Sequence, residues 1–279
     1  MFNEVRAVVL VAWLHYTKRS EVGAKAMIKE VIRNNTHPKC YSDAIASINS
    51  KFIEFANHCD EAPDNIGLFI TPQQRRRELF FYEIYKLILD KPGSIAQFGV
   101  RWGRELAFFE SLRTVFEPFN HSRRIVGFDT FAGYSGLSEK DGATSQMSSG
   151  NLSVSENHKT FLEELLRDRE LLSPVQQYQK FTLVEGDVRE TLEPYLEENP
   201  HEIFSLVHLD LNLYEPTKKV IQLIKPRLFS GSIIIVDEVN LKSIPGETVA
   251  IMEEFELTNL RLRRLPQISP TWPCYFEVS

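Results

Sequence analysis

The feature that most constrains the fold of this 279-residue chain is an alternation of short β-rich runs with longer helical ones, beginning at residue 94. Apolar runs separated by helix-length segments are typical of βαβ units, whose crossovers are right-handed. The pattern therefore predicts an α/β fold with a parallel sheet. The five runs are SIAQFGV, RRIVGFD, KFTLVEGD, IFSLVHLD and GSIIIVDE, and helices are expected between them at Arg104–Phe116, His158–Asp168 and Glu215–Pro226.

Two further β-rich runs, LRLRRLP and WPCYFEVS, follow near the end of the chain. They are too close together for a helical crossover, so they are expected to pair antiparallel. Added to the five parallel strands, they predict a doubly wound, seven-stranded, mostly parallel sheet of the Rossmann-like kind.

The first 90 residues are predicted to form an N-terminal helical segment, followed by an α/β domain at residues 91–279. The apolar run AVVLVAWL (Ala7–Leu14) is too short to cross a bilayer, and it lacks the basic start and the cleavage site of a signal peptide. We interpret it as the buried face of a helix. Apolar helices in this segment favour a homodimer or another homo-oligomer.

Two helices can be delimited in this segment. Ser42–Cys59 has apolar residues at helical spacing, with Ser42 or Asp43 as the cap. The next helix is expected to begin after Thr71, its N-cap, and to stop before the sequence KPG. The basic run QRRREL (Gln73–Leu79) lies near the start of that helix and is interpreted as an ordinary solvated face.

Composition bears on partners and compartment. The formal net charge of −6 argues against a nucleic-acid scaffold, because phosphate binding needs a basic surface. The three cysteines have no metal-ligand spacing and do not suggest a disulfide framework, which favours a reducing compartment. We therefore expect a cytoplasmic protein with no nucleic-acid or membrane partner.

Polar residues collect where the predicted strands end. The first strand runs into Gly99, and carboxylates close the other four, at Asp129, Asp187, Asp210 and Asp237. In open α/β sheets, ligands bind beyond the carboxyl ends of the strands, where the strand order reverses. A single polar strand end carries little information, since strands must end in polar residues. Four carboxylates together predict a binding cleft.

The residue types suggest a nucleotide-like ligand on one side of this cleft. Gly99 and Gly103 would let backbone N–H groups and a helix N-terminus approach a ligand, although close packing of a strand and a helix also requires glycine. Asp129 would accept hydrogen bonds from both ribose hydroxyls of an adenosine-type cofactor. Asp187 would receive the amine of the adenine.

Oxygen-bearing side chains gather on the other side, at Asp210, Asn212, Asp237 and Glu238. Such groups suit Mg²⁺ or a similar hard cation, and the alternative is that they position lysines or a backbone turn. His208 shares the strand face of Asp210. It is a candidate general base, but a buried, hydrogen-bonded histidine is the commoner case.

A long polar segment, Gly133–Asn157, follows Asp129 closely and is rich in glycine and serine. Loops of this length in compact domains are usually functional or disordered. Two interpretations therefore stay open, a lid over the substrate and simple disorder.

Several motifs together resemble the macrocin O-methyltransferase family. They are SIAQFGVRWGREL with GFDTFAGY, then VEGDVRETL, LDLNLYEPT, and DEVN followed by PGET, and the likeness spans about residues 70–256. The family transfers methyl groups from S-adenosylmethionine to hydroxyls on natural-product sugars, and characterised members use a divalent metal that holds the acceptor. The resemblance implies a class I methyltransferase fold, bound S-adenosylmethionine and a small-molecule acceptor.

The resemblance also implies which residues serve which ligand. The cofactor would be held at the ends of the first three strands, and a magnesium ion at the ends of the last two. Asp210 or, failing it, His208 would accept the proton of the acceptor hydroxyl. The implied cofactor residues are Gln97, Gly99, Arg101, Gly103, Asp129, Thr130 and Asp187, and the implied metal ligands are Asp210, Asp237 and Glu238.

The chain departs from the family pattern at several positions. Gln97 stands in place of an acid, Arg101 and Trp102 reverse the usual order, and Arg104-Glu105 replace a small polar pair. At Asn212 the family has a second aspartate, and an amide ligates Mg²⁺ more weakly than a carboxylate does. Metal-independent methylation of a nitrogen or a carboxyl is therefore one alternative, and a binding protein without catalysis is another. A nicotinamide dehydrogenase is disfavoured because G-x-G-x-x-G is absent.

Overall fold

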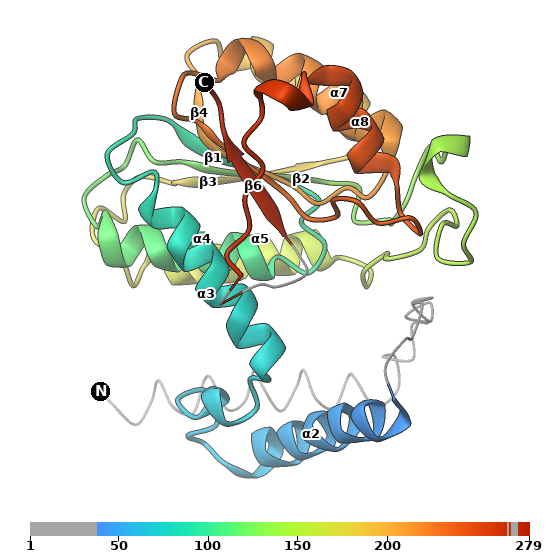
Figure 1. Ribbon diagram of the computed structural model, residues 1–279. Coiled ribbons are helices and arrows are strands. Elements are labelled where there is room, and N and C mark those ends of the chain that lie inside the picture. The colour runs from blue at the N-terminus through green and yellow to red at the C-terminus, as the bar shows by residue number, and fades with distance from the viewer. Residues whose placement is uncertain (1–37, 267, 269–272) are drawn as a thin grey trace.

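A computed structural model describes residues 38–266, 268 and 273–279. Its centre is a six-stranded sheet in the order β3-β2-β1-β4-β5-β6, with helices on both faces (Figure 1). Strands β1 to β5 are parallel, and β6 pairs antiparallel with β5. The strands are β1 Ser94–Phe98, β2 Ile125–Asp129, β3 Phe181–Glu185, β4 Phe204–Leu209, β5 Ile233–Val236 and β6 Cys274–Glu277.

Each face of the sheet carries its own hydrophobic core. Helices α3, α4 and α5 cover one face and α6, α7 and α8 the other, as Figure 1 shows. Successive strand residues point to opposite faces, so Ile95 enters the first core and Ala96 the second. The helices are α2 Lys39–His58, α3 Pro72–Lys86, α4 Arg104–Phe116, α5 His158–Glu170, α6 Val188–Glu198, α7 Tyr214–Ile224 and α8 Gly246–Glu254.

The five parallel strands and the doubly wound order are as predicted, but the predicted seventh strand is wrong. Its run makes one isolated antiparallel bridge, between Arg263 and Tyr275 of β6. Arg261, Leu262, Arg263 and Arg264 are all exposed, and only Leu260 and Leu265, near the ends of the run, pack against the cores. The middle of the run therefore has no apolar face to bury against the sheet. The described sheet therefore has six strands, mostly parallel.

The first residues of α2 and α3 can be compared with the predicted N-caps. Thr71 caps α3 as expected, and its backbone N–H also donates to the side chain of Gln74 at 2.7 Å, which completes a capping box. Helix α2 begins at Lys39 after Pro38, so neither Ser42 nor Asp43 is its cap. Helix α2 has no buried residue, whereas α3 buries Phe81 and its neighbours in the core.

Other predictions for the N-terminal segment stay predictions. The run Ala7–Leu14 lies outside the described residues. The predicted homodimer, which rests on the apolar N-terminal helices, is therefore not tested. The division of the chain at residue 90 is likewise untested. Among the helices in the described ranges, none is long and apolar enough to cross a membrane.

The segment after β2 has a defined path along the rim of the sheet. Asp141 is fully buried there and accepts a hydrogen bond from the backbone N–H of Tyr214, at the start of α7, at 2.5 Å. Lys140 forms an ion pair with Glu253 of α8. These contacts tie the middle of the segment to α7 and α8, while its role as a lid stays a prediction.

Candidate active site

A cleft of about 1540 Å³ opens at the carboxyl ends of the parallel strands, where the strand order reverses between β1 and β4. A pocket for one drug-sized ligand has roughly 300–1,000 Å³, so this cleft has room for two. Its wall includes most of the predicted site residues: Gly99, Arg101, Asp129, Thr130, Asp187, Asp210, Asp237 and Glu238. The predicted residues outside the wall are Gln97, Gly103 and His208.

The two glycines of the β1–α4 loop are needed by the backbone itself. Gly99 has φ +91°, and a Cβ there would collide with the carbonyl oxygen of Asp210 at the end of β4. Gly103 has φ +81°, and a Cβ there would run into the side chain of Leu162 on α5. Close packing is therefore sufficient reason for both glycines, and of the two only Gly99 lines the cleft.

Asp129 connects the loops that follow β1 and β2, on the side of the cleft where the cofactor is predicted (the cofactor side). Its Oδ2 accepts hydrogen bonds from the backbone N–H groups of Val100 and Arg101, both at 2.7 Å. Its Oδ1 accepts one from Phe131 at 2.6 Å. Burial raises the pKa of Asp129, although these N–H groups oppose the rise. Because a carboxylate offers about four acceptor positions, little capacity is left for ribose hydroxyls.

Two other predicted cofactor residues use their polar groups within the loops. The buried side chain of Gln97 donates to the carbonyl of Gly99 at 3.0 Å, and its Oε1 has no hydrogen-bond partner among the described residues. The Thr130 hydroxyl donates to the carbonyl of Gly133 at 2.8 Å. Gln97 thus supports the floor of the loop, and Thr130 shapes the turn after β2.

Asp187 ends the cofactor side as the N-cap of α6. It accepts from the backbone N–H of Arg189 at 3.0 Å and from the hydroxyl of Ser135 at 2.7 Å. The Arg189 side chain and these donors lower the pKa of Asp187 to about 2. The carboxylate therefore stays ionised at the cleft edge.

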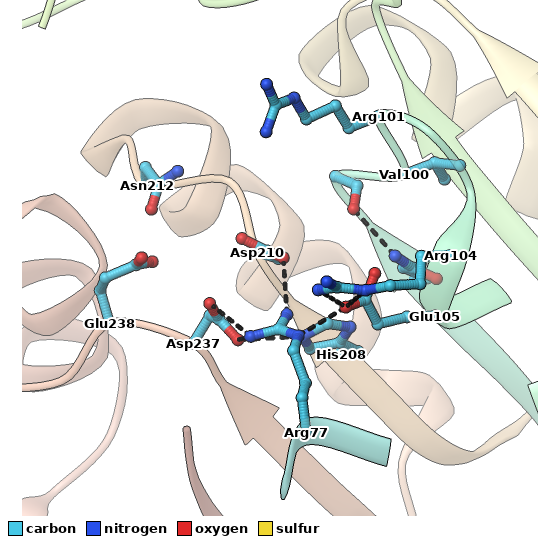
Figure 2. A network of polar contacts seen from close by, with 12 residues as sticks. Arg77, Val100, Arg101, Arg104, Glu105, His208, Asp210, Asn212, Asp237 and Glu238 are labelled. Atoms are coloured by element: carbon cyan, nitrogen blue, oxygen red, sulfur yellow. Dashed lines mark hydrogen bonds and ion pairs between the residues drawn. The ribbon is translucent and has the colours of Figure 1, made fainter. Parts of the chain in front are cut away.

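Arg77 is an unexpected residue on the acidic side of the cleft, which carries Asp210, Asn212, Asp237 and Glu238. Figure 2 shows it reaching from α3 to Asp210 and Asp237, with Glu105 on its other flank. Its Nη1 lies 2.8 Å from Asp237 Oδ1, its Nη2 3.3 Å from Asp210 Oδ2, and its Nε 2.5 Å from Glu105 Oε1. The interpretation of the basic run as a solvated face is therefore wrong for Arg77.

Packing explains why Arg77 turns inward. Its guanidinium carbon lies 5.2 Å from the ring centre of Phe81, one helical turn further along α3. The Arg77 side chain is 21% exposed, while Arg75 and Arg76 face solvent. Burial alone would lower the pKa of Arg77, but the charges of Asp237, Glu105 and Asp210 raise it. The side chain is a permanent cation.

The two aspartates that contact Arg77 differ in their proton affinity. Burial and the negative charge of Asp237 raise the pKa of Asp210, and Arg77 only partly opposes the rise. Burial would also raise the pKa of Asp237, but Arg77 and His208 outweigh it and lower the pKa. Asp210 is therefore the member of the pair that takes up a proton more readily.

His208 lies beneath these aspartates, with no exposed surface. Its Nε2 is 3.6 Å from Asp237 Oδ1, and neither ring nitrogen has a hydrogen-bond partner in the described part of the chain. It is buried as expected, but it is not hydrogen-bonded. Its ring packs edge-on against Phe81, with the ring centres 5.0 Å apart.

Asn212 occupies a position that suits an amide. Its φ is +63°, a left-handed conformation that asparagine adopts more readily than most residues. With its amide oriented to pair donors with acceptors, it donates to Glu238 and accepts from the Tyr134 hydroxyl at 2.8 Å. Burial and the charges of Asp237 and Glu247 raise the pKa of Glu238 well above its ordinary value.

Glu247, in the PGET motif, was not predicted as a site residue. It is fully buried and accepts hydrogen bonds from the backbone N–H groups of Leu211, Asn212 and Glu238 at 2.7, 2.8 and 3.2 Å. It therefore fixes the ends of β4 and β5 relative to each other. The available signal was its place in the PGET motif, but the residues whose N–H groups it accepts from are 9 to 36 positions away in the sequence.

The acidic side offers metal ligands but does not fit a metal ion as it is arranged. His208, Asp210 and Asp237 each have a potential ligand atom within 4.8 Å of the others, with His208 in the place expected for Glu238. However, the Arg77 guanidinium already contacts both aspartates. A divalent ion bound to both would have to displace it.

Comparison with solved structures finds close likeness to a methyltransferase of natural-product biosynthesis. The chain is 35% identical to CalS11, a calicheamicin methyltransferase, with a TM-score of 0.83 over 88% of this chain and 95% of that one. An apo structure of CalS11, described as a TDP-rhamnose 3′-O-methyltransferase, gives 34% identity and a TM-score of 0.76 over 87% and 96%.

The O-methyltransferase NovP is more distant, with 17% identity and a TM-score of 0.56 over 73% of this chain and 80% of that one, which supports the fold alone. No family model matches the chain, and no curated protein matches it.

Proposed function

The chain belongs to the macrocin O-methyltransferase family and is an S-adenosylmethionine-dependent O-methyltransferase, and we propose that its acceptor is a hydroxyl of a nucleotide-linked deoxysugar. The observation that carries the proposal is the 34% identity to a TDP-rhamnose 3′-O-methyltransferase over 96% of that chain. The volume of the cleft, about 1540 Å³, supports it, because a cofactor and a sugar nucleotide must be bound together.

The two sides of the cleft would divide the work. S-adenosylmethionine, when bound, supplies an already activated methyl group, so the protein mainly has to align the acceptor oxygen and take its proton. We assign the cofactor to the wall formed by Gly99, Arg101, Asp129, Thr130 and Asp187, with Gln97 and Gly103 supporting the loop from behind. The acceptor then faces the acidic side.

Asp210 is the better candidate for the general base. Its side chain is 24% exposed and lines the cleft, whereas His208 is fully buried beneath it and cannot reach an acceptor. The raised pKa of Asp210 suits a base that works near neutral pH. His208 lies behind Asp237, with Nε2 3.6 Å from Asp237 Oδ1, and is assigned no proton transfer. We assign no step to magnesium, because Arg77 already contacts Asp210 and Asp237.

Two measurements test the proposal. Isothermal titration should show S-adenosylhomocysteine binding to the unaltered protein, with loss of binding in Asp129→Ala and normal binding in Asp237→Ala. Asp168→Ala, an exposed change on α5, is the control. Circular dichroism must show that Asp129→Ala is folded, since Asp129 also joins two loops.

The acceptor is tested separately, with TDP-rhamnose and S-adenosylmethionine and detection of the methylated sugar nucleotide by mass spectrometry. Free rhamnose should not be methylated. Normal cofactor affinity in Asp129→Ala would show that the cofactor side is wrongly assigned. Cofactor binding without methylation of any nucleotide-linked deoxysugar would contradict the proposed acceptor alone.

A further inference from the structure

The acidic side of the cleft already contains a cation that belongs to the chain. We propose that Arg77 is the resident cation of the cluster Glu105, Asp210 and Asp237 and takes the place of a divalent metal, so that methyl transfer by this enzyme needs no metal ion. The proposal rests on the proposed function, because it concerns the same cleft.

The contacts of Arg77 leave little for a metal to bind. Its two terminal nitrogens contact Asp237 and Asp210 at 2.8 and 3.3 Å, and Nε contacts Glu105. A planar guanidinium offers five donors in a fixed arrangement, so one side chain can serve three carboxylates at once. A divalent ion on both aspartates would have to break two of these three ion pairs.

The position of Arg77 is fixed by the helix that carries it. The capping box of Thr71 and Gln74 fixes the start of α3, and Phe81, buried in the core, lies under the guanidinium. A side chain placed by a packed helix is held more precisely than one on a loop. Arg77 is therefore a built component of the cleft.

The remaining oxygen ligands are also engaged. Glu238, the third predicted metal ligand, accepts a hydrogen bond from the Asn212 amide, which in turn accepts from Tyr134. Asn212 is neutral and adds no negative charge to the set. Fewer carboxylates weaken a magnesium site, whereas Arg77 supplies positive charge without metal.

In this arrangement Arg77 is a positioning residue that acts through Asp210. The acceptor oxygen forms its bond to the methyl carbon while the S–CH₃ bond breaks and its electron pair stays on sulfur, giving S-adenosylhomocysteine. The hydroxyl proton passes to Asp210. Arg77 holds that carboxylate at the cleft and offsets the charge of Asp237 behind it.

Manganese binding followed by electron paramagnetic resonance tests the proposal without any turnover. The unaltered protein and the matched control Arg76→Met, an exposed arginine one residue away, should leave the Mn²⁺ signal that of the free ion. Arg77→Met should bind Mn²⁺ at least about tenfold more tightly, because Asp210 and Asp237 then lose their shared guanidinium, while Glu105 keeps its ion pair with Arg104. Mn²⁺ should also raise the melting temperature of Arg77→Met only. Equal Mn²⁺ affinity in all three proteins would overturn the proposal.

Turnover provides the second arm. Methyl transfer by the unaltered enzyme should be unchanged in EDTA, and Arg77→Lys should keep part of the metal-free rate, since it retains the charge but cannot bridge three carboxylates. Loss of turnover in EDTA, restored by Mg²⁺, would overturn the proposal. Titration with S-adenosylhomocysteine distinguishes failure of the proposed function from failure of the Arg77 proposal. Absence of cofactor binding would contradict the proposed function, whereas the manganese measurement tests Arg77 without any cofactor.

Discussion

Two arginines with acidic partners lie at opposite ends of the sheet, and their surroundings differ. Arg123 is 1% exposed at the amino ends of the strands and donates to the carbonyls of Gly93, Ile88 and Lys91 and to the hydroxyl of Ser205. Its charge is met by one carboxylate, Glu117. Arg77, at the carboxyl ends, faces three carboxylates and a cleft.

The comparison distinguishes polar groups that stabilise the fold from polar groups that remain available to bind a ligand. Around Arg123 the Glu117 carboxylate also accepts from Tyr85 at 2.6 Å and from Asn120 at 2.8 Å, so the network is closed. Around Arg77 the His208 nitrogens have no hydrogen-bond partner in the described residues, and Asp210 stays partly exposed. A closed network adds rigidity, while an open one leaves groups for a ligand.

The sharpest test of this contrast is Asp210→Asn, for which we expect the largest effect. The amide cannot accept the proton of the acceptor hydroxyl, so turnover should fall about 10²- to 10⁴-fold. The affinity for S-adenosylhomocysteine and the free energy of unfolding should change little. Steady-state kinetics and titration measure both. A variant with normal turnover would remove Asp210 from the mechanism.

Arg123→Met should have the opposite profile. It leaves Glu117 and several backbone carbonyls without their donor, and loss of one partner of a buried ion pair costs about 3–5 kcal/mol of unfolding free energy. Urea unfolding measures this loss. In the folded fraction, turnover should be normal. If the variant unfolds at the same urea concentration as the unaltered protein, the structural role of Arg123 is wrong.

Glu117→Gln should give the smallest of the three effects, and one that depends on pH. Burial alone would raise the pKa of Glu117, but hydrogen bonds from Arg123 and Tyr85 lower it on balance. A pKa lowered by folding stabilises the protein above the ordinary glutamate pKa of about 4.3, and this contribution disappears as the pH falls through the folded-state value.

The variant should therefore be less stable than the unaltered protein at pH 7, by about 1.5–3 kcal/mol. The two unfolding curves should approach each other on acidification. A constant difference from pH 7 down to pH 3 would show that the Glu117 charge is not what stabilises this end of the sheet.

The sequence was most informative where local pattern and fold topology coincide. A carboxylate after each of four apolar runs predicted one cleft, and Asp129, Asp187, Asp210 and Asp237 do line it. The parallel order of the strands follows from the helices between them. The assignment of cofactor and metal roles to these residues rested on resemblance and stays a prediction.

The sequence was least informative where a side chain meets residues far along the chain. Arg77 precedes the buried Phe81, Ile84 and Ile88 by four, seven and eleven residues, which is helical spacing, but the basic run around it suggests a solvated face. That pattern cannot say that the guanidinium reaches Asp237, 160 residues later. The seventh strand failed for a related reason, because pairing requires a face to bury and not only β-prone residues.

The contribution of α3 to the cleft has a consequence for how such enzymes diversify. The helix precedes the first strand, yet it supplies both core side chains such as Phe81 and a charge beside Asp210. An exchange of N-terminal segments between relatives therefore transfers a piece of the reaction chemistry together with the segment. On the proposal that Arg77 replaces the metal ion, recombination ahead of β1 would produce chimeras whose metal requirement follows the donor of the helix.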